Sequence, residues 1–341
     1  MLKPRDLLAA TLAILTLTCS PVISLAGETS VLVIAGGAGG IGFDDLGFSS
    51  ELHKVIIPAG RLGKVVLFDP ASKEMEEIGG FSSQNDFAGG HGEGVTSADV
   101  GRGAIFATDR DEKTLDLVDP VSKRILAKTK LASGPDYVRF VAATNEVWVT
   151  EPHASQIEIF SLPQQGFPVP NHAATIAIPN GPESLIIDGE AGRAYTNLWS
   201  DTTLAIDLRK RAIASRWRNG CHGSRGIALD TTRGFLFVGC EEGKLEVLDA
   251  KDGRRLGEAA SGDGVDIIAY APKLHHAYLP GGDSATMTVI DISATGKPTM
   301  LGTVATARDS HCVTADDLGN AYICDPHKGQ LILLHDSFRQ K

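Results

Sequence analysis

A strand-and-turn pattern recurs seven times along the chain and limits the possible folds more than any other feature of the sequence. Each unit contains a short alternating or apolar run that ends in a polar turn. The runs are KVVLFDP, TLDLVDP, QIEIFSL, TLAIDL, KLEVLDA, MTVIDI and QLILLHD. They recur about every 40 to 50 residues, and repetition at that period indicates stacked or radially arranged units.

Three further segments keep the same order within each unit. A segment marked by glycine and acidic residues comes first, as in GPDYVRF, and a β-rich segment such as EVWVTEP precedes the run. After most runs a fourth stretch follows, such as KRILAKTKL. Short strands of this kind, separated by turn residues, are typical of all-β folds. Four strands in each of seven units predict a seven-bladed β-propeller with four-stranded antiparallel blades.

The N-terminal strand is predicted to close the ring. The last unit, from Ser310 onward, ends without a clear fourth strand, and SVLVIAG near the N-terminus belongs to no other unit. The GGAGGIG stretch that follows fits the G-x-G-x-x-G pattern of dinucleotide-binding proteins. That alternative requires a helix whose N-terminus holds the pyrophosphate, but glycine, paired serines and Pro58 interrupt the next segment. We therefore expect these glycines to connect the closing strand to the first blade.

Residues 1–26 have the features of a secretory signal peptide. Two basic residues precede an apolar stretch from Leu7 to Thr18, and Ser24-Leu25-Ala26 places small residues before a cleavage point. We predict that residues 27–341 form one propeller domain, located in the periplasm or secreted. The apolar stretch is shorter than the roughly 18 residues that a membrane span needs, and no later segment reaches that length. We expect no membrane span.

Four cysteines follow the predicted signal peptide, which is an even number in an oxidising compartment. We predict the disulfides Cys221–Cys240, within the fifth blade, and Cys312–Cys324, within the seventh. Buried free thiols are the alternative.

The repeated pattern, the predicted export and the coverage of the whole chain resemble the YVTN-repeat, YncE-like bacterial β-propellers. VWVTEP and AYTNLW are the segments nearest to the Tyr-Val-Thr-Asn string, which is absent in its literal form. The resemblance implies a propeller that acts as a binding scaffold and does not imply a particular activity.

One residue near the start of each blade is predicted to face the central channel. These residues are Asp45, Glu93, Asp136, Glu183, Arg225, Asp266 and Ser310. So many converging carboxylates repel one another unless a cation, shared protons or Arg225 relieves the charge. One hypothesis is a divalent cation, Ca²⁺ or Mg²⁺ rather than Zn²⁺, held by Glu93, Asp136, Glu183 and Asp266. The other is a hydrated channel whose acids are partly neutralised by Arg225 and Arg139.

The loops after the second strands are expected on the same face as this ring. Histidines that lie there together with carboxylates can bind zinc or copper or supply a general base. Trp199 follows its strand and is the tryptophan best placed to contact a ligand, whereas Trp148 lies within a strand and is expected in the core. The predicted ligand-binding residues are His91, Glu93, Asp136, Arg139, Glu151, His153, Glu183, His222, Arg225, Asp266 and His311.

Two functions fit these observations. The first is an exported, non-enzymatic and monomeric scaffold that binds a small ligand, a metal ion or a protein partner at the channel mouth. The second is a metal-dependent hydrolase or lactonase, in which a cation polarises a carbonyl and activates water. GEGVT, which contains Glu93, resembles the Glu-Gly motif of gluconolactonase-like propellers. The net charge of −10 argues against nucleic acid as the main partner.

Overall fold

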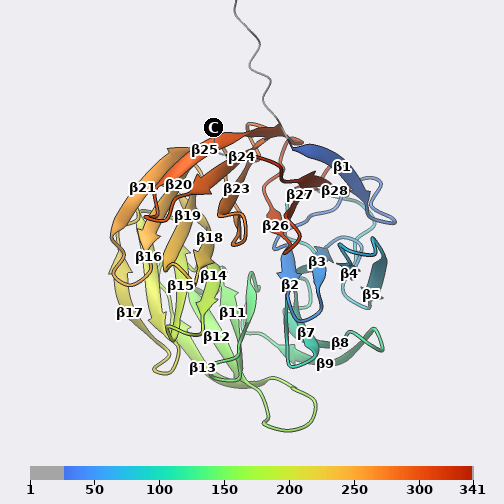
Figure 1. Cartoon of the computed structure of the whole chain (residues 1–341). Helices are drawn as coiled ribbons and strands as arrows, with labels where there is room; N and C mark the ends of the chain where they lie inside the picture. The colour runs from blue at the N-terminus through green and yellow to red at the C-terminus, as the bar shows by residue number, and fades with distance from the viewer. Residues whose placement is uncertain (1–26, 340–341) are drawn as a thin grey trace, which may run out of the picture.

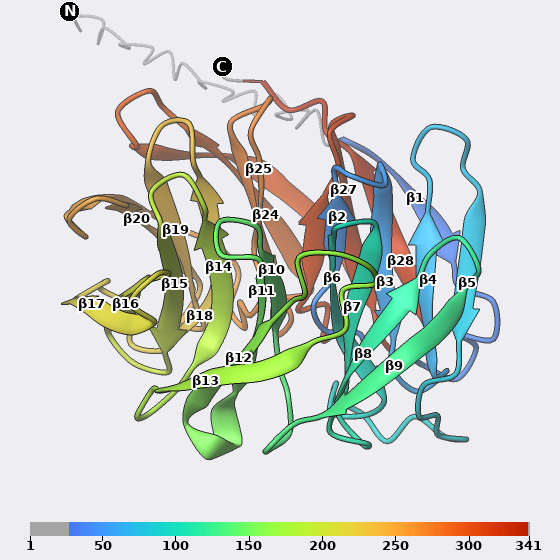
Figure 2. The same cartoon turned by 90° about the horizontal axis from the view of Figure 1, so that it is seen from below.

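Seven four-stranded antiparallel sheets surround a central axis in the computed structural model, which describes residues 27–339 (Figure 1). Seen from the side in Figure 2, the strands run between the two faces of the ring. The predicted seven-bladed β-propeller is therefore confirmed. The predicted signal peptide, residues 1–26, lies outside the described residues.

The strands fall into blades in chain order. Blades 1 and 2 contain β2 (Gly47–Ser49), β3 (Lys54–Ala59), β4 (Lys64–Phe68), β5 (Met75–Gly79), β6 (Val95–Gly101), β7 (Ala104–Asp109), β8 (Thr114–Asp119) and β9 (Arg124–Lys130). Blades 3 and 4 contain β10 (Val138–Val141), β11 (Glu146–Glu151), β12 (Gln156–Ser161), β13 (Asn171–Ala177), β14 (Glu183–Asp188), β15 (Arg193–Leu198), β16 (Thr202–Asp207) and β17 (Ala212–Trp217), and the short helix η1 (Pro152–Ala154) follows β11. Blades 5 and 6 contain β18 (Ser224–Asp230), β19 (Phe235–Cys240), β20 (Lys244–Asp249), β21 (Arg255–Ala260), β22 (Ala269–Ala271), β23 (His276–Gly281), β24 (Thr286–Ile292) and β25 (Pro298–Ala305). Blade 7 contains β26 (Val313–Ala315), β27 (Asn320–Asp325), β28 (Gln330–His335) and β1 (Glu28–Val33).

The burial pattern of the strands explains their different sequences. The second strands β7, β11, β19, β23 and β27 are buried at every position, because both of their faces pack against neighbouring blades. The outer strands β9 and β17 alternate between exposed and half-buried residues. Trp148 in β11 is fully buried, and its indole Nε1 donates a hydrogen bond to Glu146 Oε2 at 2.9 Å. Burial on both faces explains why these second strands are rich in apolar residues.

The N-terminal strand closes the ring as predicted. β1 pairs with β28 in antiparallel register from Glu28 opposite His335 to Val33 opposite Gln330. The glycine-rich stretch then leads from β1 to β2 in the first blade. A Cβ atom at Gly37 would lie 2.2 Å from the carbonyl oxygen of Gly329, so a side chain cannot be accommodated at this backbone approach. The glycines therefore serve the turn between two blades.

Both predicted cysteine pairs lie at disulfide distance. The Cα atoms of Cys221 and Cys240 are 5.3 Å apart, and those of Cys312 and Cys324 are 5.6 Å apart. Cys221 lies in the segment before β18, and Cys240 ends β19. No helix within residues 27–339 has the length and apolar character needed to cross a membrane.

We expect the variant Cys221→Ser/Cys240→Ser to have a free energy of unfolding about 3 kcal/mol below that of the unsubstituted protein. The bridge joins residues separated by 19 positions, and its loss frees that loop in the unfolded chain. Urea denaturation of both proteins measures the difference. Alkylation of Cys221 and Cys240 in the native, unreduced protein would contradict the assignment.

Candidate functional site

Segments that precede the innermost strands of several blades meet at one end of the channel and line two adjoining cavities. The first cavity has a volume of about 480 Å³ and the second about 500 Å³. His91, Arg225 and Asp266 line both. We call the two cavities with their lining residues the channel mouth. Charged and aromatic residues of the first cavity are Asp44, His91, Arg110, Asp136, Tyr137, His153, Glu183, Trp199, Arg225 and Asp266.

Arg110 links the charged groups on one side of the mouth. It follows β7, and its Nη2 donates to Asp44 Oδ2 at 2.7 Å and also to Asp136. Its remaining guanidinium N–H groups donate to the carbonyl oxygens of Pro135 and His91, each at 2.9 Å. A planar fork of donors suits such a position, because it satisfies two carboxylates and two backbone oxygens at once.

Asp44 and His91 form an ion pair beside Arg110. His91 Nδ1 lies 3.2 Å from Asp44 Oδ2, although the two atoms are not aligned as a hydrogen bond. The charge of Asp44 raises the pKa of His91 to about 9 against the opposing effect of burial. Burial alone would raise the pKa of Asp44, but the charges of His91 and Arg110 outweigh it and lower that pKa.

Two other acids of the mouth bind protons more tightly than usual. Burial raises the pKa of Asp136 to about 7, although Arg110 opposes the shift. Burial and the charges of Asp136 and Asp266 raise the pKa of Glu183 well above its usual range. Trp199 donates from its indole Nε1 to Glu183 Oε2 at 2.6 Å. Strongly shifted carboxyls within a cavity are a feature of functional sites.

The second cavity contains a pair of stacked histidine rings. The ring centroids of His91 and His311 are 4.8 Å apart with an angle of 37° between the planes. His311 Nδ1 lies 2.7 Å from the carbonyl oxygen of Asp309, and its Nε2 lies 3.0 Å from the carbonyl oxygen of Phe43. The rings come from the segments before β6 and β26, which are distant in sequence.

Seven of the predicted site residues line the channel mouth. They are His91, Asp136, His153, Glu183, Arg225, Asp266 and His311. Arg225 contacts Glu241 Oε2 at 2.9 Å and lies 4.0 Å from Glu183.

The other four predicted residues lie elsewhere. Glu93 lines neither of the mouth cavities, and His222 is exposed outside them. Glu151 is fully buried, where it accepts hydrogen bonds from the backbone N–H of Ser133 at 3.0 Å and from Gln156 at 2.6 Å. Arg139 donates to both carboxylate oxygens of Asp45, at 2.5 and 2.9 Å, and so does not neutralise the acids of the mouth.

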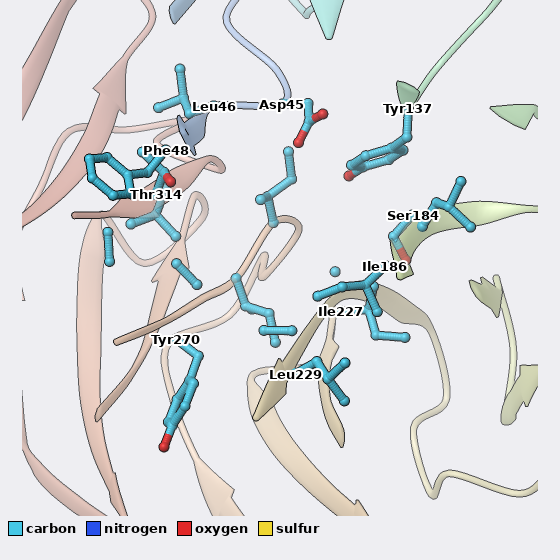
Figure 3. A pocket seen from close by; sticks show the side chains of 18 of the residues that line it. Asp45, Leu46, Phe48, Tyr137, Ser184, Ile186, Ile227, Leu229, Tyr270 and Thr314 are labelled. Carbon is cyan, nitrogen blue, oxygen red and sulfur yellow. The ribbon is translucent and has the colours of Figure 1, made fainter. Parts of the chain in front are cut away.

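Asp45 was predicted to face the channel, whereas its neighbour Asp44 lies at the mouth together with Arg110. The two aspartates are adjacent and point into different cavities. Asp45 lines a third cavity of about 320 Å³, further along the channel, where Figure 3 shows Phe48, Tyr137 and Ile186 among the surrounding side chains. Nothing in the local sequence of Arg110 indicates that its side chain reaches two acids of other segments.

One group of three ligand-type side chains at the mouth has its donor atoms within 4.8 Å of one another, namely Asp44, His91 and His311. Within the described residues, no such group includes Glu93, Asp136, Glu183 or Asp266. The predicted Ca²⁺ or Mg²⁺ set therefore stays a prediction, without a compact arrangement of its four carboxylates.

Comparison with solved structures defines the class of protein. The chain is similar to a chain of the hydrazine synthase of Kuenenia stuttgartiensis, with a TM-score of 0.71 and 12% identity over 89% of this chain and 97% of that one. It is also similar to a chain of a mitotic checkpoint complex, with a TM-score of 0.73 and 12% identity over 97% and 99%. The structure of U3-55K matches with a TM-score of 0.72 and 10% identity over 91% and 98%. These neighbours share the seven-bladed β-propeller fold.

The comparisons go no further than the fold. No family model matches the chain, and no curated protein sequence matches it. At 10 to 12% identity, the functions of the structural neighbours do not transfer to this protein.

Proposed function

We propose that this propeller is a non-enzymatic scaffold that binds a small organic cation, such as an amine, at the channel mouth. The observation that carries the proposal is the charge of the first cavity. Four carboxyl groups line it, from Asp44, Asp136, Glu183 and Asp266, against three cationic groups, which are the guanidinium groups of Arg110 and Arg225 and the imidazole of His91. A cavity with this excess of acids attracts a positively charged ligand.

The raised proton affinity of two of these acids supports a cation in particular. Burial and mutual repulsion raise the pKa of Glu183 and of Asp136. A bound ammonium group relieves the same repulsion as a bound proton, and it also donates hydrogen bonds to carboxylates.

Trp199 adds a flat wall for the apolar part of such a ligand. Its side chain is 42% exposed and its indole nitrogen is held by Glu183. An ammonium group over an indole face is attracted by the ring as well. The volume of about 480 Å³ is in the range of small-molecule sites, which favours a small ligand over a protein partner at this position.

The wider setting of this proposal is an exported, monomeric scaffold of the YVTN-repeat, YncE-like type, located in the periplasm or secreted. The two disulfide-distance cysteine pairs support an oxidising compartment. A metal-dependent hydrolase or lactonase is the alternative. It receives less support, because Asp136 and Glu183, two of its predicted metal ligands, already bond to Arg110 and Trp199.

Calorimetric titration tests the proposal. The probes are tetramethylammonium, putrescine and spermidine, with Ca²⁺ and Mg²⁺ as inorganic cations and citrate as an anion. We expect saturable one-to-one binding of at least one organic cation, and a change in Trp199 fluorescence that the variant Trp199→Phe lacks. The variant Glu183→Gln/Asp266→Asn should bind that probe at least about tenfold more weakly, since two charged hydrogen-bond acceptors are lost.

The matched control is Glu190→Gln/Asp252→Asn, which removes the same charge at two exposed positions outside the mouth. It should bind the probe as the unsubstituted protein does. Equal weakening in both double variants would mean general attraction to an acidic protein, and would overturn the proposal. If only Ca²⁺ or Mg²⁺ binds, and the Glu183→Gln/Asp266→Asn variant loses it, the result favours the hydrolase.

A further inference from the structure

We propose that Asp44, His91 and His311 form a binding site for a transition-metal ion of the zinc or copper class. This site shares Asp44 and His91 with the lining of the first cavity, but metal binding does not require that the cavity bind an organic cation. Donor atoms of the three side chains lie within 4.8 Å of one another, so small side-chain movements would bring them onto one ion with bonds of about 2.0 to 2.2 Å. The argument rests on the hydrogen-bonding contacts of the two imidazole rings.

His311 has a hydrogen-bond acceptor at each of its two ring nitrogens. The carbonyl oxygens of Asp309 and Phe43 lie 2.7 Å from Nδ1 and 3.0 Å from Nε2, and a carbonyl oxygen only accepts. A neutral imidazole has one N–H group, so one nitrogen must face a carbonyl oxygen with its lone pair. That nitrogen has no hydrogen-bond donor opposite it, as a metal-binding nitrogen requires.

The contact with Asp309 fits a metal-binding histidine. An Nδ1–H group that donates to a backbone carbonyl is the arrangement that orients metal-binding histidines and directs the Nε2 lone pair to the ion. Here that lone pair points toward the backbone oxygen of Phe43, the residue directly before Asp44.

His91 supplies the second nitrogen. Its Nδ1 atom is buried and has no hydrogen-bond partner, although Asp44 Oδ2 is only 3.2 Å away. Metal binding would release the proton that this ion pair holds, because a histidine ligand must be neutral, and Asp44 would then neutralise the ion in place of the proton. The ring of His91 lies beside that of His311 at a tilt of 37°, and donor atoms of the two rings are within 4.8 Å of each other.

The donor set selects the class of metal. Two imidazole nitrogens and one carboxylate oxygen suit Zn²⁺, Cu²⁺ or Ni²⁺, whereas Ca²⁺ and Mg²⁺ prefer sets of oxygen atoms. Arg110 also donates to Asp44 Oδ2, so the ion would share this carboxylate with the guanidinium group. Three protein ligands leave a coordination position for water or for a ligand in the adjoining cavity.

Titration of the untagged, chelator-stripped protein with Zn²⁺ tests the site. We expect one ion per chain. His91→Gln and His311→Gln should each weaken binding by more than the roughly 10- to 100-fold that the loss of an outer-shell partner costs. His222→Gln is the matched control, because this exposed histidine lies outside both cavities, and it should bind Zn²⁺ normally. Absence of saturable Zn²⁺ binding, or equal binding by all three variants, would overturn the proposal.

A second measurement does not depend on the folding of variants. Electron paramagnetic resonance of the Cu²⁺-loaded protein should show coupling to two imidazole nitrogens. A spectrum without nitrogen coupling would overturn the site. The Glu183→Gln/Asp266→Asn variant keeps all three proposed ligands, so it should lose the organic cation and still bind Zn²⁺. This variant separates failure of the metal site from failure of the proposed function.

Discussion

A variant that lacks residues 28–33 should have a free energy of unfolding about 3 to 6 kcal/mol below that of the complete protein. These residues form β1, and deleting them removes a strand that pairs with β28 at six positions. A net contribution of roughly 0.5 to 1 kcal/mol for each position gives this range. The deletion also leaves blade 7 with three strands and exposes the edge of β28, so we expect aggregation at high protein concentration.

Urea denaturation measures this loss, with Val31→Thr/Val33→Thr as the control. Both side chains are exposed, by 55% and 66%, and the substitutions preserve the backbone pairing of β1. The control should change stability by less than about 0.5 kcal/mol for each substitution. A deletion protein as stable as the control would contradict the role of β1 in closing the ring.

Replacement of Arg110 by methionine should lower the free energy of unfolding by about 3 to 5 kcal/mol at neutral pH. Its guanidinium group is the cation nearest to Asp44 and Asp136, which are both buried. Removal of one partner leaves buried charges without compensation, and this is more costly than the loss of the ion pair itself.

Two further variants make this test specific. Arg209→Met removes an exposed arginine and should change stability by no more than about 0.5 kcal/mol. In the Arg110→Met protein, the additional substitutions Asp44→Asn and Asp136→Asn should recover part of the loss, because the uncompensated charges are gone. If Arg110→Met alone behaves like Arg209→Met, Arg110 does not hold the mouth together electrostatically.

The sequence predicts the architecture of this protein well because the fold repeats. Each blade has the same order of strands, so one misassigned strand does not change the repeat that the other blades show. The N-terminal strand belongs to no other unit, and the last unit is the one that lacks a fourth strand. The cysteine pairs follow from the same alignment of blades. The glycine motif shows the limit of a local pattern, since Gly37 serves a close backbone approach to Gly329 in a turn between two blades.

The site was only partly predictable because its residues lie in irregular segments. A strand alternates its side chains between two faces, but Asp44 and Asp45 precede β2, where no such period decides which of them faces the mouth. Glu151 was predicted as a ligand-binding residue of the loops, and nothing in the sequence indicates that the backbone of Ser133 binds its side chain. Long side chains such as Arg110 reach across blades, and sequence position does not indicate their partners.

The central claim, that the channel mouth is the ligand site, is tested most directly by a crystal structure of the protein with the organic cation that binds most tightly in the titrations. We predict density for this probe in the first cavity, beside the indole ring of Trp199 and within hydrogen-bonding distance of Glu183 or Asp266. Density for the probe in the cavity lined by Asp45 and Arg139, or on the outer surface of the blades, would contradict the account.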